Sequence, residues 1–287
     1  MDTPTQPILC CLGETVAGCP TQFLMERAFG ALGLDWRAIT VEVEGNQFEV
    51  AAQGMAAMHF RALRLFPSLE EIAAQHFFKD PLDQFIGHAT SAALLDGHWM
   101  AWNNTGSTIL ACLAQRSPLA NCVVWLHGNT PRTRSTLVAI VRESTMPQAI
   151  LCTAAEWTRE SLPAQLAGLS NLHLCQSMES SSELLLNILQ EANAEGEASD
   201  RAEIGMPVVL IADQLDAHDQ HTLEESLASV GGSAIYACRL DEPNRVSEVL
   251  TDVDIAVAAE AFDFSRWTGH EVDVGLLRDA YDEYSDF

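Results

Sequence analysis

The sequence predicts an α/β protein with two domains, and three observations lead to this. The chain has 287 residues, which exceeds the roughly 250 residues that one hydrophobic core usually supports. Its first hundred residues combine short strand patterns with amphipathic helix patterns. From residue 121 onward, apolar stretches of strand length alternate with helical stretches, which is typical of a Rossmann-like parallel sheet covered by helices.

Local signals define the elements expected in the N-terminal part. Gly33 ends an amphipathic helix, and Asp96-Gly97 separates two apolar runs, which is a strong hairpin signal. The elements expected here are strands 7–13 and 36–43, helices 22–33 and 67–78, and the hairpin around residues 96–97. The first domain is therefore placed at residues 1–106, joined by about 255–287 from the end of the chain.

The second domain is placed at residues 107–254. Its expected strands are 121–128, 148–153, 171–177, 206–213 and 233–240, and its expected helices are 106–117, 133–144, 156–168 and 181–193, with a further helix before the last strand. A charged loop is expected at 195–205. Two helices, 254–267 and 271–284, separated by a stop at Gly269, complete the chain.

Charge and cysteine usage exclude several classes of function. There are 40 acidic against 15 basic residues, for a net charge of -25, and Lys79 is the single lysine. Nucleic acids and anionic membranes are therefore excluded as partners. The eight cysteines lie mostly in apolar runs without a CxxC pair, and Cys10, Cys11 and Cys19 lack zinc-ligand spacing, so no metal is expected. With neither a basic leader nor a long apolar segment, we expect a soluble, cytoplasmic protein.

The segment VVWLHGNTPRTRS is the most suggestive local motif. A strand that ends in a glycine-containing loop and opens a helix is where a Rossmann fold binds pyrophosphate. Gly128 is the only glycine left in this loop, so Arg132 and Arg134 either pair with an anion or lie in a solvated turn. An α/β-hydrolase, with Asp213 as its acid, would need a GxSxG motif, and the chain has none.

Four motifs resemble the shikimate dehydrogenase family. GETVAGCPTQFLMERAFGALGLD is similar to the family's opening motif, and FRALRLFPSLEE to its NVTxPxK segment. IGHATSAALLDGHWMAWNNTG resembles the block that runs from GAVNT to NTDG, and WTGHEVDV resembles the C-terminal WTG signature. The resemblance spans nearly the whole chain and implies an NADP-dependent interconversion of 3-dehydroshikimate and shikimate.

The resemblance also implies a substrate pocket, although this chain departs from the family at most of its positions. The serine pair becomes Cys19 and Thr21, and the catalytic lysine becomes Leu69, or Glu70 if the register shifts by one. The catalytic aspartate becomes Thr105. The pocket positions implied are Cys19, Thr21, Leu65, Thr90, Asn103, Thr105 and Ala259. Neither catalytic charge is retained, and a general acid–base pair supplies about 10²- to 10⁴-fold in rate.

The cofactor positions are weakened in the same way. NADP is the cofactor that the resemblance implies, and we expect its binding to be weak or absent. The family's glycine-rich loop falls on His127, Gly128, Asn129, Thr130, Arg132 and Arg134. The motif that contacts the 2′-phosphate falls on 153–155, where this chain has Thr-Ala-Ala.

Two hypotheses follow. In the first, the chain is a degenerate shikimate dehydrogenase-like protein with little or no standard activity, which binds a small molecule or a protein partner. In the second, it is an active oxidoreductase of the same family with an altered substrate and a rebuilt catalytic site. In either case the expected ligand is a small molecule in the crevice between the domains, and the expected state is a monomer or a homodimer.

Overall fold

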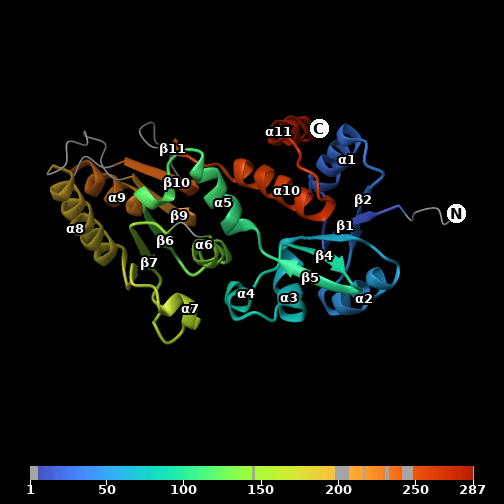
Figure 1. Cartoon of the computed structure of the whole chain (residues 1–287), viewed down its shortest axis with the longest axis horizontal. Coiled ribbons are helices and arrows are strands. Elements are labelled where there is room, and N and C mark those ends of the chain that lie inside the picture. The colour runs from blue at the N-terminus through green and yellow to red at the C-terminus, as the bar shows by residue number, and fades with distance from the viewer. Residues whose placement is uncertain are drawn as a thin grey trace. The chain divides into compact units, whose positions relative to one another are not determined.

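A computed structural model describes residues 6–143, 146–197, 207–215, 217–229, 233–240 and 248–286. The chain divides into two compact units. Unit 1 consists of Met1–Thr105 and Ala256–Phe287, and unit 2 of Gly106–Ile255. Both are α/β structures built on one sheet each (Figure 1).

Unit 1 is built on a mixed five-stranded sheet with the order β2-β1-β3-β4-β5. Its strands are β1 (Ile8–Gly13), β2 (Arg37–Glu42), β3 (Ala62–Leu65), β4 (Ser91–Leu95) and β5 (His98–Trp102). Strand β1 pairs in parallel with β2 and β3, whereas β3, β4 and β5 pair antiparallel. The predicted hairpin is confirmed, and its turn residues Asp96 and Gly97 have φ values of 50° and 80°, as a two-residue hairpin turn requires.

The helices of unit 1 include several that the sequence indicated. They are α1 (Thr21–Leu32), α2 (Phe48–Ala57), α3 (Pro67–Phe77), α4 (Pro81–Ile86), α10 (Asp252–Thr268), which begins in unit 2, and α11 (Val274–Ser285). A short 3₁₀ turn, η1 (Gly45–Gln47), precedes α2. Gly33 ends α1 in a left-handed conformation, and Gly269, with φ of 73°, follows α10. Both predicted helix ends are confirmed.

The two faces of the unit 1 sheet differ in chemistry. Residues alternate between faces along a strand. Leu63 and Leu65 of β3 lie in an apolar cluster with Phe48 of α2 and Leu69 of α3. Arg64, between the two leucines, therefore points to the opposite face. On that face α10 packs on the sheet, and its Trp267 donates a hydrogen bond from Nε1 to the Ala92 carbonyl at 3.1 Å.

Unit 2 has the predicted Rossmann-like sheet. Its strands are β6 (Val123–His127), β7 (Ala149–Thr153), β8 (Leu172–Cys175), β9 (Pro207–Leu215), β10 (Ser233–Leu240) and β11 (Glu248–Val249). All described pairings are parallel. The order β8-β7-β6-β9-β10-β11 is the 3-2-1-4-5-6 order of a dinucleotide-binding fold.

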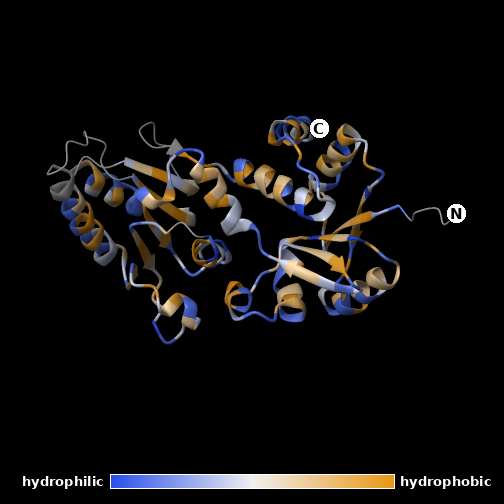
Figure 2. Ribbon diagram, in the orientation of Figure 1, coloured by the Kyte–Doolittle hydropathy of each residue, from blue (hydrophilic) through white to orange (hydrophobic). Residues whose placement is uncertain are grey.

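Helices α6, α8 and α9 pack against strands of the unit 2 sheet. The helices of the described part of unit 2 are α5 (Thr105–Ala114), α6 (Pro131–Arg142), α7 (Ala164–Ala167), α8 (Met178–Glu197) and α9 (Ala217–Ser229), with a 3₁₀ turn η2 (Leu119–Asn121) before β6. Helices α8 and α9 share an apolar cluster with one sheet face, including Leu185, Leu223 and Trp125. Helix α6 contacts β6 and β9. The strands of both units are largely apolar (Figure 2).

Two predictions about unit 2 need correction or restriction. The helix predicted at 156–168 is wrong over most of its length, because residues 155–162 form turns and only the short α7 is helical. Pro163 precedes α7, and Arg159 donates to the carbonyls of Leu169 and Leu172. Of the loop predicted at 195–205, residues 195–197 belong to α8, and the remainder lies outside the described residues.

Within the described ranges, no helix is both long enough and apolar enough to span a membrane.

Candidate functional site in unit 1

A buried charge cluster lies on the polar face of the unit 1 sheet. Arg64 of β3 meets two carboxylates of α10, Glu260 and Asp263, which are three residues apart and so lie on one face of the helix. The side chains of these three residues are 16%, 7% and 0% exposed, respectively. Buried charges are stable only when paired and hydrogen-bonded, so this pairing ties α10 to the strand.

Asp263 uses both carboxylate oxygens. Its Oδ2 lies 3.2 Å from Arg64 Nη1 and accepts a hydrogen bond from the Ser91 hydroxyl of β4. Its Oδ1 accepts a bond of 2.8 Å from Trp102 Nε1 of β5. Above the Trp102 ring, the guanidinium of Arg266 lies 4.1 Å from the ring centroid. Asp263 is therefore held by three donors from three strands.

Glu260 is held differently. Its Oε1 accepts a hydrogen bond of 2.7 Å from the Thr21 hydroxyl and lies 3.4 Å from Arg64 Nε. Its Oε2 is buried without a hydrogen-bond partner among the described residues. Cys19 lies beside this group, with Sγ 3.6 Å from the Thr21 hydroxyl oxygen. Thr21, a predicted pocket residue, thus donates to one of the protein's own carboxylates.

The electrostatics of the cluster shift several pKa values. Burial by itself lowers the pKa of Arg64, but Glu260 and Asp263 outweigh this and raise it. Burial raises the pKa of Asp263 to about 6 against the opposing effects of Arg64 and Ser91. Burial also raises the pKa of Glu70 to about 7, again against the charge of Arg64. Glu70 is therefore the group whose protonation changes near neutral pH.

The structure connects a second group of predicted positions. The Thr90 hydroxyl lies 3.1 Å from Asn104 Oδ1, and Asn104 Nδ2 donates to the Ala259 carbonyl at 3.2 Å. Asn103 donates from Nδ2 to the His88 carbonyl and accepts from the Thr105 backbone N–H at 3.0 Å. The Ala89 N–H, between His88 and Thr90, donates to the Glu70 carbonyl at 2.9 Å. Thr90, Asn103, Thr105, Ala259 and Glu70 thus belong to one hydrogen-bonded region.

The two positions that the resemblance allows for the family's lysine have different environments. Leu69 is completely buried and packs in the apolar cluster with Leu63 and Leu65. Glu70 is partly exposed. Leu65, expected in the pocket, is 1% exposed and lies in the same apolar cluster. Cys19 is half-buried, and burial is the main cause of its raised thiol pKa, so this thiol stays protonated and is a poor nucleophile.

The predicted phosphate loop of unit 2 forms its own cap. The hydroxyls of Thr130 and Thr133 accept hydrogen bonds from each other's backbone N–H groups, which makes a capping box at the start of α6. Pro131, at the first helical position, has no N–H. Gly128 takes a φ of 87°, and its N–H donates to the Thr153 carbonyl. Three of the four positions 130–133 therefore offer no N–H to a pyrophosphate.

Arg132 is also engaged within unit 2. Its Nη2 lies 2.8 Å from Asp252 Oδ1, and its Nε lies 3.5 Å from Asp213 Oδ1. Its Nη1 donates to the carbonyls of Ala212 and Ala237 at 3.2 and 3.5 Å. Arg132, for which an anion or a solvated turn was expected, instead joins the ends of β9 and β10 to the start of α10.

The remaining loop positions differ in exposure and in their contacts. His127 Nε2 lies 3.9 Å from Asp219 Oδ2, Asn129 is exposed and Arg134 is half-buried. Thr153 is 6% exposed and accepts a hydrogen bond of 2.8 Å from Trp125 Nε1. In this loop the N–H groups of Thr130 and Thr133 and the guanidinium of Arg132 therefore already have protein partners in place of the phosphates of NADP.

Gly106, in the segment that resembles NTDG, has a packing role. A Cβ atom at this position would lie 2.2 Å from the Ser135 carbonyl oxygen of α6. The Gly106 N–H donates to the Ser135 hydroxyl at 2.9 Å. Only glycine allows α5 and α6 to approach this closely.

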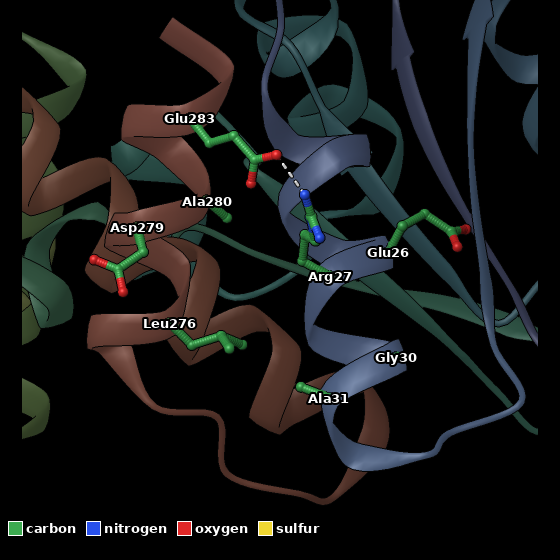
Figure 3. A pocket seen from close by; sticks show the side chains of 8 residues that line it. All are labelled: Glu26, Arg27, Gly30, Ala31, Leu276, Asp279, Ala280 and Glu283. Atoms are coloured by element: carbon green, nitrogen blue, oxygen red, sulfur yellow. Dashed lines mark hydrogen bonds and ion pairs between the residues drawn. The ribbon is translucent and has the colours of Figure 1, made fainter. Parts of the chain in front are cut away.

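A shallow groove of about 490 Å³ lies between α1 and α11, away from these residues (Figure 3). Its lining combines Gly30, Ala31 and Leu276 with an ion pair between Arg27 and Glu283. It contains none of the predicted site residues. Among the described residues there is also no group of three or more His, Cys, Asp or Glu side chains that could hold a metal ion.

The sequence motifs did not point to Arg64, Trp102, Glu260 or Asp263. A signal was present, since Arg64 interrupts an apolar strand and the two carboxylates interrupt the apolar helix pattern AVAAEAFDF at positions three apart. Charged residues inside apolar elements are seldom buried without partners. The pairing itself joins segments nearly 200 residues apart, and no local pattern predicts it.

The arrangement defines a two-domain α/β protein with a Rossmann-like second unit, and solved structures share this fold. Shikimate 5-dehydrogenase from Listeria monocytogenes, in complex with shikimate and NAD, matches with a TM-score of 0.73 and 13% identity over 97% of both chains. The ligand-free 5-ketofructose reductase of Gluconobacter sp. strain CHM43 matches at 0.70 and 14%, over 98% of this chain and 99% of that chain. Shikimate 5-dehydrogenase from Thermus thermophilus, with NADP(H) and shikimate, matches at 0.65 and 18%, over 97% and 99%.

The chain therefore has a shikimate dehydrogenase-like fold, which confirms the fold that its motifs predicted. Its structural neighbours are oxidoreductases of the shikimate dehydrogenase type. No protein-family model matches the chain, and no curated protein matches it by sequence. At identities of 13–18%, the likeness to these structures concerns the fold alone.

Proposed function

We propose that this chain is a shikimate dehydrogenase-like protein that has lost NADP-dependent turnover and uses unit 1 to bind a small molecule. The observation that carries this proposal is the occupation of the family's cofactor loop by the protein itself. The capping box of Thr130 and Thr133 and the ion pairs of Arg132 use the donors that a pyrophosphate would need.

The catalytic positions support the same conclusion. Hydride transfer to a carbonyl needs a group that delivers a proton to the developing alkoxide, and the family uses a lysine and an aspartate there. This chain has Leu69 or Glu70 at the first position and Thr105 at the second. Leu69 is buried in the core, and a threonine hydroxyl does not ionise at neutral pH.

A turnover assay tests the proposal. The full chain, at high concentration, is incubated with shikimate and NADP⁺ or NAD⁺, and absorbance at the wavelength of the reduced nucleotide is followed. We expect no signal above a nucleotide-only blank, while the Thermus thermophilus enzyme, run in parallel, gives turnover. Shikimate-dependent reduction of either nucleotide would refute the loss of activity.

One observation favours a second candidate function, an oxidoreductase for an uncharged keto or hydroxy compound. Burial raises the pKa of Glu70 to about 7, close to the value that suits a general acid–base group at neutral pH. A 5-ketofructose reductase has a similar fold. At least one protein with this fold is therefore named for a reaction of an uncharged sugar.

The two candidates differ in a measurable way. If the second is right, 5-ketofructose or a related keto sugar oxidises NADPH in the presence of the chain, and Glu70→Gln abolishes that rate. A matched variant, Glu71→Gln, changes the exposed neighbour of Glu70 on α3 and leaves the rate unchanged. No keto-sugar-dependent rate is expected under the first proposal.

A further inference from the structure

We infer that Glu260 determines which ligands unit 1 accepts: its carboxylate fills a carboxylate-binding site formed by Thr21 and Arg64, and so excludes ligands that carry a carboxylate. This inference rests on the proposed small-molecule role of unit 1 and specifies its ligand class as uncharged. Its test involves no nucleotide, so the two proposals can fail separately.

The donor set is the first step. Thr21, at the start of α1, offers a hydroxyl, and Arg64, in β3, offers a guanidinium edge. A hydroxyl and a guanidinium directed at one point are a common combination for binding a carboxylate, because the hydrogen bond from the arginine is charge-assisted. Glu260 Oε1 occupies that point: it accepts a hydrogen bond of 2.7 Å from Thr21 Oγ1 and forms an ion pair with Arg64 Nε at 3.4 Å. This ion pair is not a hydrogen bond, because Arg64 Nε has no hydrogen-bond partner among the described residues.

The second step compares Glu260 with Asp263, the other carboxylate that pairs with Arg64. Asp263 pairs with Arg64 on its own, and both of its oxygens have donors. Glu260 uses one oxygen, while Oε2 is buried and lacks a hydrogen-bond partner in the described part of the chain. A buried carboxylate oxygen without a hydrogen bond destabilises the fold, so a stabilising role does not explain its presence. Because Asp263 keeps Arg64 paired, removing Glu260 does not leave an unpaired buried cation.

The third step is exclusion. Glu260 is 5% exposed and Thr21 is 2% exposed, so a ligand carboxylate would have to displace the side chain rather than bind beside it. A second carboxylate close to Glu260 would also meet like-charge repulsion in a poorly solvated site. An uncharged hydroxyl or carbonyl group does not meet that repulsion. Glu260 therefore disfavours an acidic ligand group at this point more than a neutral one.

Removal of Glu260 should open the site to small carboxylates. The variants are Glu260→Ala, which vacates the space, and the double variant Glu260→Ala/Thr21→Val, which also removes the hydroxyl donor. Glu260→Gln, whose amide still fills the space, is the matched control. The probes are sodium acetate and its uncharged isostere acetamide, with sodium chloride used to hold ionic strength constant.

We expect acetate to raise the melting temperature of Glu260→Ala by about 2–4 °C per kcal/mol of binding free energy, with no such rise from acetamide. The wild type, Glu260→Gln and the double variant should show no acetate-specific rise. If Glu260→Ala is unfolded without ligand, acetate but not acetamide should restore cooperative unfolding. Equal responses of Glu260→Ala and wild type, or no response of Glu260→Ala to acetate in either state, would overturn the inference.

Discussion

Nη1 of Arg64 lies 3.2 Å from Oδ2 of Asp263, and this contact joins residues that are 199 positions apart in the sequence. Asp263 is fully buried, and the Arg64 side chain is 16% exposed. Strand β3, which resembles a catalytic segment of the family, is thus bound to α10 by a charge pair as well as by apolar packing.

Replacement of Arg64 should destabilise the protein strongly. Arg64→Met keeps the volume but leaves Asp263 and Glu260 without their cation, and breaking a buried pair in this way typically costs about 3–5 kcal/mol. Arg27→Met is the control, because Arg27 pairs with Glu283 at the surface and such pairs contribute about 0–1 kcal/mol. Urea unfolding followed by circular dichroism measures both, and similar losses for the two variants would contradict the buried-pair account.

The free energy of unfolding should fall as pH rises from about 4 to 7. The pKa values of Asp263 and Glu70 are raised to about 6 and about 7, so the folded state holds their protons more tightly than the unfolded state, where these groups titrate near pH 4. When the folded state binds more protons, stability decreases with pH.

Glu70→Gln separates the contribution of the Glu70 pKa to this pH dependence from the repulsion among the chain's many other carboxylates. The variant should match the wild type near pH 4 and exceed its stability near pH 8, by an amount on the order of 1–3 kcal/mol. Urea midpoints at a series of pH values provide the comparison. Parallel pH profiles for the two proteins would show that Glu70 has an ordinary pKa in the folded state.

Two glycine-to-alanine changes should have opposite effects. Gly106→Ala places a Cβ atom 2.2 Å from the Ser135 carbonyl oxygen, and the resulting overpacking costs about 1–3 kcal/mol or more. A Cβ atom at Gly54, inside α2, would meet no neighbouring group within 4 Å, so Gly54→Ala should stabilise the helix by about 0.5–1 kcal/mol. Thermal unfolding of both variants measures these effects, and a neutral Gly106→Ala would contradict the close approach of α5 and α6.

Much of the fold was predictable because local signals and topology agreed. Gly33 and Asp96-Gly97 mark a helix end and a hairpin wherever they occur, and regular βαβ alternation restricts the sheet of unit 2 to few arrangements. The predicted helix at 156–168 was wrong, although the apolar spacing of this segment fits a helix. The chain forms turns before Pro163, and only the short α7 after it is helical. Helix α2 was not predicted.

The site was less predictable than the fold. The motifs located Thr21, Thr90 and Asn103, and the structure gives each of them a protein partner. The partners Glu260 and Asp263 come from a helix whose contact with β3 no local pattern specifies. Likewise, Arg132 was expected either at an anion or in a solvated turn. Its pairing with Asp213 and Asp252 depends on strand ends that only the folded sheet brings together.

Direct binding of NADPH tests the central claim most directly. Isothermal titration of NADPH into the full chain, with the Thermus thermophilus enzyme as the positive control, should give heats no larger than dilution, since Thr130, Thr133 and Arg132 already use the donors of the loop. Stoichiometric binding with a Kd below about 0.1 mM, equivalent to roughly 5.5 kcal/mol, would contradict the account.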